Sequence, residues 1–328
     1  MASNTILVTG GAGYIGSHMV KMLLERGHQV IVLDNLSSGH REAVPGGRFV
    51  HGDIGDHDVL DRIFGEHTVD GVMHFASHIQ VGESVSHPQM YYRNNLVNTL
   101  ALLDAMVAHG VKRLIFSSSA AIFGEPQHLP IDETHPKMPI NPYGRSKWMV
   151  EQILESYDRA YGLKSVCLRY FNAAGADPDG TLGERHDPET HLIPLVLRAA
   201  SARLDAVRVF GRDYPTPDGT CVRDYIHVVD LCQAHLLALE RLQCRASSAA
   251  YNLGNGAGFS VQQVIDAAQE VTGRRIAVND SPRREGDPAV LVADAALARE
   301  ALGWKPRYHE LETIIRHAWV WEQKLCNG

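Results

Sequence analysis

Tyr143 and Lys147 have the residue types and the spacing that point most directly to chemistry. They lie four residues apart in a helix predicted to run from 141 to about 161, so they share one helical face. A free tyrosine hydroxyl has a pKa of about 10. An ammonium about 5 Å away, at an effective dielectric constant near 20, favours the phenolate by about 3 kcal/mol, or two pKa units. The pair is therefore predicted to act as a proton acceptor, although Tyr-x-x-x-Lys also occurs on solvated helices.

A strand that ends in hydroxyls precedes this helix. Residues 113–119 form an apolar run that finishes in three serines, Ser117 to Ser119. A hydroxyl at that position can orient the hydroxyl group of a substrate. Ser119 is therefore predicted to assist Tyr143 in the oxidation of an alcohol.

A glycine-rich turn opens the chain between an apolar strand and a helix start. Gly10 lets the chain turn sharply off the strand, Gly13 lets backbone N–H groups approach a phosphate, and Gly16 lets the helix pack near the strand. The helix N-terminus then presents unpaired N–H groups and a partial positive charge. This pattern predicts a pyrophosphate site.

Asp34 ends the second predicted strand, 18 residues after Gly16. A carboxylate at that distance accepts ribose hydroxyls and repels a 2′-phosphate, which favours NAD over NADP. A bound oxidised nicotinamide would also push Tyr143 toward the phenolate. The alternative is a glycine turn followed by an unrelated surface aspartate.

These residues need a scaffold, and the chain supplies alternating strands and helices. The order predicts an α/β fold with a doubly wound parallel sheet, the Rossmann arrangement, and a smaller C-terminal α/β substrate domain. Gly10, Asp34, Ala76 and Ser119 all follow strand ends, so they are expected in one crevice. We expect an NAD-binding domain at 1–171, with a return near 225–235 in which the strand-like 225–229 rejoins it. The smaller, substrate-binding domain is expected at 172–328.

Composition excludes several classes of protein. The 328 residues carry a net charge of −7, which argues against nucleic-acid partners and anionic membranes. No apolar run approaches 18 residues, and no signal-peptide pattern precedes the first strand. The five scattered cysteines suggest free thiols. These features predict a cytoplasmic protein without nucleic-acid or membrane partners.

The assembled motifs resemble the extended short-chain dehydrogenase/reductase family. The resemblance rests on the turn Gly10-Gly11-Ala12-Gly13-Tyr14-Ile15-Gly16, on Tyr143-x-x-x-Lys147 and on Arg169-Tyr170-Phe171-Asn172. Within that family the chain is similar to the UDP-glucose 4-epimerases, from residue 6 to about 321. The stretches that carry this narrower resemblance are His74-Phe75-Ala76, Val81-Gly82-Glu83-Ser84, Tyr91-Tyr92, residues 222–228, Tyr251-Asn252-Leu253-Gly254 and Arg283-Arg284-Glu285-Gly286-Asp287.

The resemblance implies a bound, recycled NAD, a UDP-hexose substrate and epimerisation through a 4-keto sugar. Tyr143 would take the proton of the sugar 4-hydroxyl. The implied cofactor contacts are Tyr14, Ile15, Asp34, Asn35, Asp53, Ile54, Phe75, Ala76, Asn94, Ser119, Tyr143, Lys147 and Tyr170. The implied UDP-sugar contacts are Asn172, Leu192, Phe210, Arg223, Tyr225, Arg284 and Asp287.

Physical chemistry agrees with several of these implied contacts and leaves alternatives for others. Arg223 and Arg284 can bind a diphosphate bidentately, and Asp287 can accept ribose hydroxyls, but each also suits a surface ion pair. Asp53 suits an adenine amino group or the N-cap of the next helix.

Four departures distinguish the chain from one well-known branch of the epimerases. Ile79 stands where that branch has a lysine beside the cofactor, and His191 stands where it has an asparagine. Ala120 and Ala121 stand where that branch has Ala-Thr, which removes one possible sugar contact. Leu291 stands where some members have a bulky tyrosine, so we expect tolerance of N-acetylated UDP-hexoses.

Three alternatives stay open at this point. The first is a dehydratase or decarboxylase on the same scaffold, and of these a dehydratase would carry an acid pair where Ala120 and Ala121 stand. A non-enzymatic dinucleotide sensor would typically lack the Tyr/Lys pair. The apolar helices 91–109 and 143–161 fit either a homodimer interface, which the resemblance implies, or simple coverage of the sheet.

No metal is expected from the sequence. The chain has 18 histidines, and His186 and His191 flank acidic residues. None of them falls in a tight ligand motif such as His-Glu-x-x-His, and the inferred chemistry needs no metal.

Overall fold

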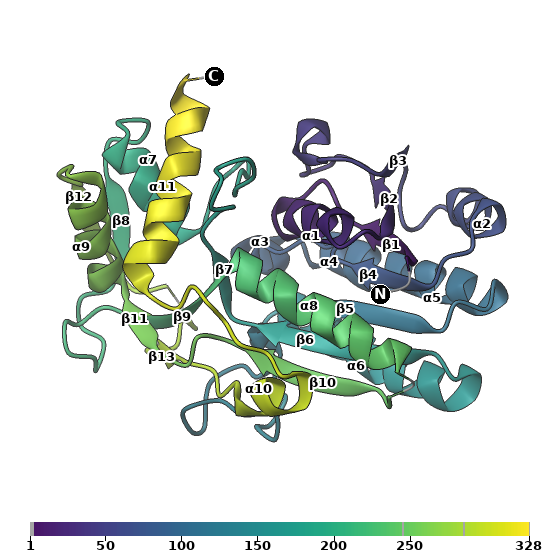
Figure 1. Ribbon diagram of the computed structural model, residues 1–328. Coiled ribbons are helices and arrows are strands. Elements are labelled where there is room, and N and C mark those ends of the chain that lie inside the picture. Colours follow the sequence, from purple (N-terminus) through teal and green to yellow (C-terminus); the bar gives the residue numbers. More distant parts are fainter. Residues whose placement is uncertain (1–2, 245, 285, 328) are drawn as a thin grey trace.

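A seven-stranded parallel sheet forms the centre of the larger lobe in this computed structural model, which describes residues 3–244, 246–284 and 286–327 (Figure 1). The strand order is β10-β6-β5-β4-β1-β2-β3, so the direction of winding reverses between β1 and β4. Ligands of such sheets bind at the carboxyl ends beside this reversal. The predicted doubly wound fold is confirmed. The strands are β1 (Thr5–Thr9), β2 (Gln29–Asp34), β3 (Arg48–His51), β4 (Gly71–His74), β5 (Arg113–Ser119), β6 (Lys164–Tyr170) and β10 (Ala249–Leu253).

Alternating residues of the buried strands build two apolar layers. Ile6 and Val8 of β1 pack in the layer of α1 and α8, whereas Leu7 packs in the layer of α2, α5 and α6. This alternation is the period-two pattern of a strand buried on both faces. The helices and helical turns of this lobe are α1 (Tyr14–Glu25), α2 (His57–Glu66), α3 (Val81–Ser86), α4 (Pro88–Tyr92), a π-helical turn (Arg93–Val97), α5 (Asn98–Ala108), α6 (Pro142–Tyr161), α8 (Val228–Gln243), α10 (Ala296–Leu302) and 3-10 turns at Arg41–Ala43 and Ala120–Ile122.

The smaller lobe has its own sheets and its own core. Strand β9 pairs with β7, β11 and β13, and a separate parallel pair joins β8 to β12. Three helices pack together against these strands, with α11 prominent in yellow (Figure 1). The elements are β7 (Asn172–Ala174), α7 (Leu192–Ala200), β8 (Val207–Phe210), β9 (Val222–His227), β11 (Gly258–Ser260), α9 (Val261–Thr272), β12 (Val278–Ser281), β13 (Val290–Leu291) and α11 (Leu311–Asn327).

The return of the chain to the large lobe differs from the sequence-based expectation. The strand-like segment 225–229 was expected to rejoin the first domain, but β9 pairs only within the smaller sheet. Helix α8 and strand β10 make the return instead, since α8 packs on α1, β5 and β6, and β10 pairs with β6. The division at residue 171 stays a prediction.

A long loop between β7 and α7 makes contacts with both lobes. The Tyr14 hydroxyl donates a hydrogen bond to Gly175 O at 2.7 Å, and Lys21 Nζ lies 2.7 Å from Asp177 Oδ2. From the other side, Trp321 Nε1 of α11 donates to Glu184 O at 2.9 Å. We call residues 175–191 the connecting loop. It is held at once by the first helix and by the last.

Two composition-based expectations can be compared with the structure. All five cysteines are free thiols, as expected. Within the part of the chain that the structure describes, no helix combines the length and the apolar character that crossing a bilayer requires.

Four histidines are buried in the neutral form. His74 lies between two threonines: Thr99 donates to Asn95 O, so the His74 Nε2–H donates to Thr99 and Nδ1 accepts from Thr9. Burial lowers the pKa of His74 to about 3. Burial likewise lowers the pKa to about 3 for His227 and to about 4 for His18 and His235.

These histidines should make the fold sensitive to acid. Below pH 6.5 the unfolded chain binds protons that the folded chain does not, so stability is present above 6.5 and is lost as pH falls toward the folded pKa. From pH 7.5 to 5.5 we expect a loss of about 1 kcal/mol per histidine in the free energy of unfolding. Urea unfolding of His235→Gln should show about 1 kcal/mol less acid loss than wild type. The exposed His57→Gln is the control, and equal acid loss in wild type and His235→Gln would contradict the assignment.

Candidate active site

The glycine turn has the geometry that its spacing predicts. Gly10 has φ +72°, and a Cβ there would lie 2.5 Å from Ala76 N. A Cβ on Gly16 would lie 2.1 Å from Gly10 O, so the close packing of helix on strand requires glycine. At Gly13, by contrast, a Cβ would meet Gly10 O at an ordinary 3.4 Å. The protein itself does not require glycine at that position, which fits a ligand that approaches the backbone there.

The start of α1 suits an anion. Gly13 is the N-cap, no acidic side chain lies in the first turn, and the first N–H groups of a helix lack intrahelical partners. The backbone of Tyr14 and Ile15 belongs to this first turn, although the Tyr14 hydroxyl points to the connecting loop. The turn therefore fits the pyrophosphate of a dinucleotide.

Asp34 is fixed beside this turn. Its carboxylate is buried, with Oδ2 accepting from Ala12 N at 2.9 Å and Oδ1 accepting from Leu36 N at 2.8 Å. A carboxylate offers about four lone-pair positions, so two remain for ribose hydroxyls. The position at the end of β2, one strand from the glycine turn, is the one that the sequence predicted.

Asp53 holds a loop and does not cap a helix. Its oxygens accept from Gly55 N at 2.7 Å, Asn35 Nδ2 at 2.8 Å and Asn98 Nδ2 at 2.9 Å. The N-cap of α2 is Asp56, so the capping alternative for Asp53 is wrong. Its contact with adenine stays a prediction, as does that of the buried Ile54.

The remaining cofactor candidates lie at neighbouring strand ends. Phe75 continues β4, with its ring centroid 4.9 Å from that of His235, and Ala76 N lies against Gly10. Asn94 lies in the π-helical turn and donates to Asn95 Oδ1 at 2.9 Å. Tyr170 ends β6, and its hydroxyl is hydrogen-bonded to Ser117 Oγ.

Tyr143 and Lys147 lie on the buried face of α6. The helix is started by Asn141, whose side chain accepts from Gly144 N at 2.8 Å, and by Pro142 at the first position. Lys147 is 3% exposed, and its Nζ donates to Ser117 O at 2.8 Å. Tyr143 is 9% exposed, with its ring centroid 5.9 Å from Lys147 Nζ. The structure thus brings this pair to the serine end of β5.

Burial acts against the lowering of the tyrosine pKa that the spacing predicts. Burial raises the pKa of Tyr143, and a hydrogen bond with Ser119 acts in the opposite direction. Burial also lowers the pKa of Lys147 to about 7, so its ammonium is only partly charged at neutral pH. The spacing argument left out the burial of both groups, which disfavours their charged forms.

Sequence reasoning missed the group that anchors α6. Glu151 lies one turn after Lys147 and forms a buried pair with Arg169, with Arg169 Nη2 2.6 Å from Glu151 Oε2. Ser118 Oγ donates to Glu151 Oε1 at 2.5 Å. An acidic residue at i+4 on a buried helical face was the available signal. The pair ties α6 to β5 and β6 behind the catalytic candidates.

The substrate candidates form a second group on the smaller lobe. Arg223 forms an ion pair with Asp287, and the Arg284 guanidinium lies 4.0 Å from the centroid of the Phe210 ring. Asn172 Nδ2 donates to Asp224 O at 3.0 Å. Tyr225 is buried opposite Asn172 on the neighbouring strand, and Leu192 begins α7. Glu285 of this motif lies outside the described residues.

The partner of Arg223 is not its sequence neighbour. Asp224 is buried and accepts from the backbone N–H groups of Asn255, Gly256 and Ala293, at 2.7, 3.0 and 3.1 Å. Asp224 therefore has a structural role. The ion-pair partner of Arg223 is the more distant Asp287. That ion pair fits both a surface pair and a preformed ligand contact.

The departures occupy three different environments. Ile79 is 38% exposed. His191 faces Glu184 and Glu189 in the connecting loop. Leu291 of β13 pairs with Arg223 of β9 and packs against a buried cluster of Ile122, Phe123 and Ile131, as Ala120 and Phe171 also do.

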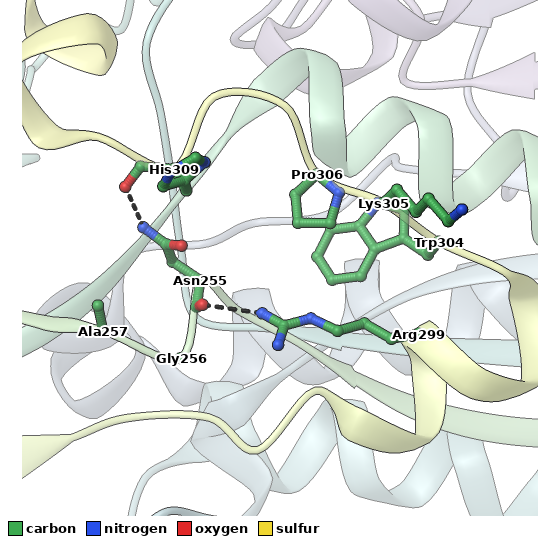
Figure 2. Close-up of a pocket in the computed structure, with 8 residues that line it drawn as sticks. All are labelled: Asn255, Gly256, Ala257, Arg299, Trp304, Lys305, Pro306 and His309. Carbon is green, nitrogen blue, oxygen red and sulfur yellow. Dashed lines mark hydrogen bonds between the residues drawn. The ribbon is translucent and has the colours of Figure 1, made fainter.

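A separate hollow of about 600 Å³ lies outside this group. It is bounded by the loop after β10 and the segment between α10 and α11, and Arg299 Nη2 donates to Asn255 O at 3.0 Å beside it (Figure 2). None of the site candidates borders it. The lining residues are Asn255, Gly256, Ala257, Arg299, Trp304, Lys305, Pro306 and His309.

The fold and the site define a dinucleotide-binding protein with a tyrosine–lysine pair, which is the class of the short-chain dehydrogenases/reductases. Residues 6–254 match the NAD dependent epimerase/dehydratase family. The chain belongs to this family.

Individual relatives show which members of this family the chain is similar to. A UDP-glucose 4-epimerase of Halalkalibacterium halodurans is 54% identical, with 98% of this chain and 97% of that protein covered. The crystal structure of a Brucella ovis UDP-glucose 4-epimerase with NAD has TM-score 0.95 and 51% identity, covering 97% of this chain and 98% of that one. The Bifidobacterium longum enzyme with NAD⁺ and UDP has TM-score 0.93 and 41% identity, covering 99% and 100%.

Three predictions are confirmed by these findings. The resemblance to UDP-glucose 4-epimerases is confirmed. The chain is an enzyme, an isomerase of the epimerase type, which removes the non-enzymatic sensor as an alternative. Its cofactor is NAD, and the cradle at Gly13 and Asp34 fits that group.

Proposed function

We propose that the chain interconverts UDP-glucose and UDP-galactose by oxidising C4 of the hexose and reducing it again from the other face. The observation that carries this proposal is the buried pair Tyr143 and Lys147 at the serine end of β5, in the sheet that bears the glycine turn. NAD supplies the oxidant and then the reductant for C4. The names of the relatives support the choice of UDP-hexose.

Each residue of the pair has a defined task in this proposal. Tyr143 takes the proton of the 4-hydroxyl. It returns the proton after the 4-keto sugar has rotated to present its other face. Once it is protonated, Lys147 stabilises the phenolate of Tyr143. Ser119 orients the sugar hydroxyl. Because burial excludes water from this corner, the attraction between ammonium and phenolate is strong.

The second group is proposed to hold the UDP portion. Arg223 and Arg284 suit the dianionic diphosphate because guanidinium groups bind phosphate oxygens bidentately. Asp287 suits the ribose hydroxyls, and Phe210, Asn172, Tyr225 and Leu192 complete the surface. The dehydratase alternative is less well supported, since Ala120 and Ala121 cannot supply the acid and the base that elimination needs.

Product analysis tests the proposal directly. Purified protein is incubated with UDP-galactose without added NAD, and the products are followed by NMR. We expect UDP-glucose to accumulate to equilibrium, because the cofactor is recycled on the enzyme. A protein that contains NAD and yields no UDP-glucose would contradict the proposed function.

Leu291 is proposed to widen the sugar pocket. It packs against the same buried cluster as Ala120, the residue that follows Ser119, and it pairs with Arg223, so we expect its size to bear on the space around the sugar. We expect turnover of UDP-N-acetylgalactosamine by the wild type, and a fall of tenfold or more in kcat/KM for that sugar in Leu291→Tyr, on the order of known pocket effects. Turnover of UDP-galactose in the same variant is the control. A wild type inactive on the acetylated sugar would sink this idea.

We also propose a cytoplasmic location and a domain boundary near residue 171.

We further propose that the chain forms a homodimer. Apolar side chains on the helical faces 91–109 and 143–161 are exposed in the single chain, among them Val97 and Met149. Light scattering should give the mass of two chains, and Met149→Asp should shift it toward one. A wild type of single-chain mass would leave these helices only their role of covering the sheet.

A further inference from the structure

The connecting loop carries a cluster that the proposed reaction does not use. Its sequence before α7 contains Glu184, His186, Glu189 and His191. Each contributes one nitrogen or oxygen atom, and the four atoms lie within 4.8 Å of one another. The glutamate side chains are 6% and 0% exposed. Two carboxylates this deeply buried need a compensating positive charge.

Each imidazole Nδ1 lies close to both glutamate carboxylates. His186 Nδ1 lies 3.2 Å from Glu184 Oε1 and 3.7 Å from Glu189 Oε2. His191 Nδ1 lies 2.8 Å from Glu184 Oε1 and 3.1 Å from Glu189 Oε1. Zinc holds nitrogen and oxygen ligands near 2.1 Å in a tetrahedron, which separates the ligand atoms by about 3.4 Å. The measured separations span that value.

Two of these atoms have no hydrogen-bond partner. His186 Nδ1 and Glu189 Oε2 are buried and unpaired among the residues that the structure describes, although each is near an atom of opposite polarity. Glu189 Oε1, by contrast, accepts from Thr190 N and His191 N and is hydrogen-bonded to His191 Nδ1. The separations of His186 Nδ1 from the two glutamates lack hydrogen-bond geometry, as is expected when lone pairs point at a shared ion and not at each other.

From this geometry we propose that Glu184, His186, Glu189 and His191 bind one divalent transition-metal ion, with Zn²⁺ the best match. Two imidazoles and two carboxylates are ligands that zinc accepts, and together they neutralise its charge. The four protein ligands fill the tetrahedron, so the site is structural and leaves no position for substrate. The sequence predicted no metal because the four ligands do not form a familiar motif.

The competing state holds protons in place of the metal. Burial alone would lower the pKa of His186 and His191, but Glu184 and Glu189 raise them to about 9 and about 10. Two imidazolium ions would then balance the two carboxylates. Arg198 Nη2, 3.9 Å from Glu189 Oε2, favours neither state specifically, since its charge is present in both.

The site would stiffen the connecting loop. Glu184 O accepts from the Trp321 indole, His186 O accepts from Arg198 at 3.3 Å, and His191 directly precedes α7. The ring of His186 also packs edge-on against Tyr14, at the start of α1. A metal here would join the cofactor side of the molecule to the substrate lobe.

Metal content and cobalt spectroscopy test the site without an activity assay. The NAD-loaded enzyme is stripped with a chelator and dialysed. One portion is then titrated with ZnCl₂ and a separate, metal-free portion with CoCl₂. We expect one Zn²⁺ per chain by elemental analysis, a rise of several degrees in Tm, and the intense visible absorption of tetrahedral Co²⁺. His186→Gln and Glu189→Gln should each lose all three signals, and His57→Gln, outside the loop, should keep them.

The outcomes separate the two states. Absence of bound zinc and of any Tm rise in the wild type would show that the cluster holds protons only. Equal binding by wild type and His186→Gln would place the metal elsewhere on the chain. Either result overturns the proposal, and neither bears on the epimerase reaction.

Discussion

Replacing Tyr143 by phenylalanine is expected to lower kcat by about three orders of magnitude, the middle of the range for loss of a general acid–base. The change removes one oxygen from a buried ring and leaves the ring in contact with its neighbours, including Tyr91 at 6.5 Å. No other hydroxyl can take its role, because Ser119 has no base of its own. Turnover of UDP-galactose under saturating substrate is the measurement.

The control for this variant lies on the same helix. Tyr157→Phe makes the same chemical change on α6, where the hydroxyl contacts Asp104 at the surface. Its turnover should stay within a factor of two of wild type, with roughly equal NAD content in all three proteins. A Tyr143→Phe enzyme with near-wild-type turnover would remove the proposed base and with it the mechanism.

Replacing Glu151 by glutamine is expected to cost about 3–5 kcal/mol in the free energy of unfolding. The substitution leaves the Arg169 guanidinium, 5% exposed as a residue, without a counter-charge. A double variant, Glu151→Leu with Arg169→Met, should recover most of this loss because it removes both buried charges. Urea unfolding in the presence of saturating NAD measures the three proteins.

A surface pair on the same helix gives the matched control. Glu155 and Arg159 lie 3.5 Å apart with side chains 67% and 83% exposed. Glu155→Gln should cost less than about 0.5 kcal/mol. If Glu151→Gln cost no more than Glu155→Gln, the pair would not anchor α6, and the alignment of Tyr143 with β5 would need another explanation.

Local signals made much of the large lobe predictable. Strand β5 and helix α6 coincide with the predicted segments because an apolar run and an Asn-Pro start define them within a few residues. The glycine turn was predictable in detail for the same reason. Gly10 and Gly16 each meet a constraint set by atoms close in sequence or beside the adjacent strand.

The contacts that could not be predicted join residues far apart in the chain. Asp53 is tied to Asn98, 45 residues away, and Arg223 to Asp287, 64 residues away. Strand β9 could join either sheet by its composition, and only the pairing with β7 decides. The pKa direction of Tyr143 depends on burial, which follows from the packing of α6 and cannot be obtained from spacing.

The connecting loop restricts how far the two lobes can move apart. Its bonds to Tyr14 at one end and to Trp321 at the other are made to opposite halves of the molecule. Moving the halves apart would break at least one of these anchors, since the loop cannot follow both halves, and so the loop opposes wide opening.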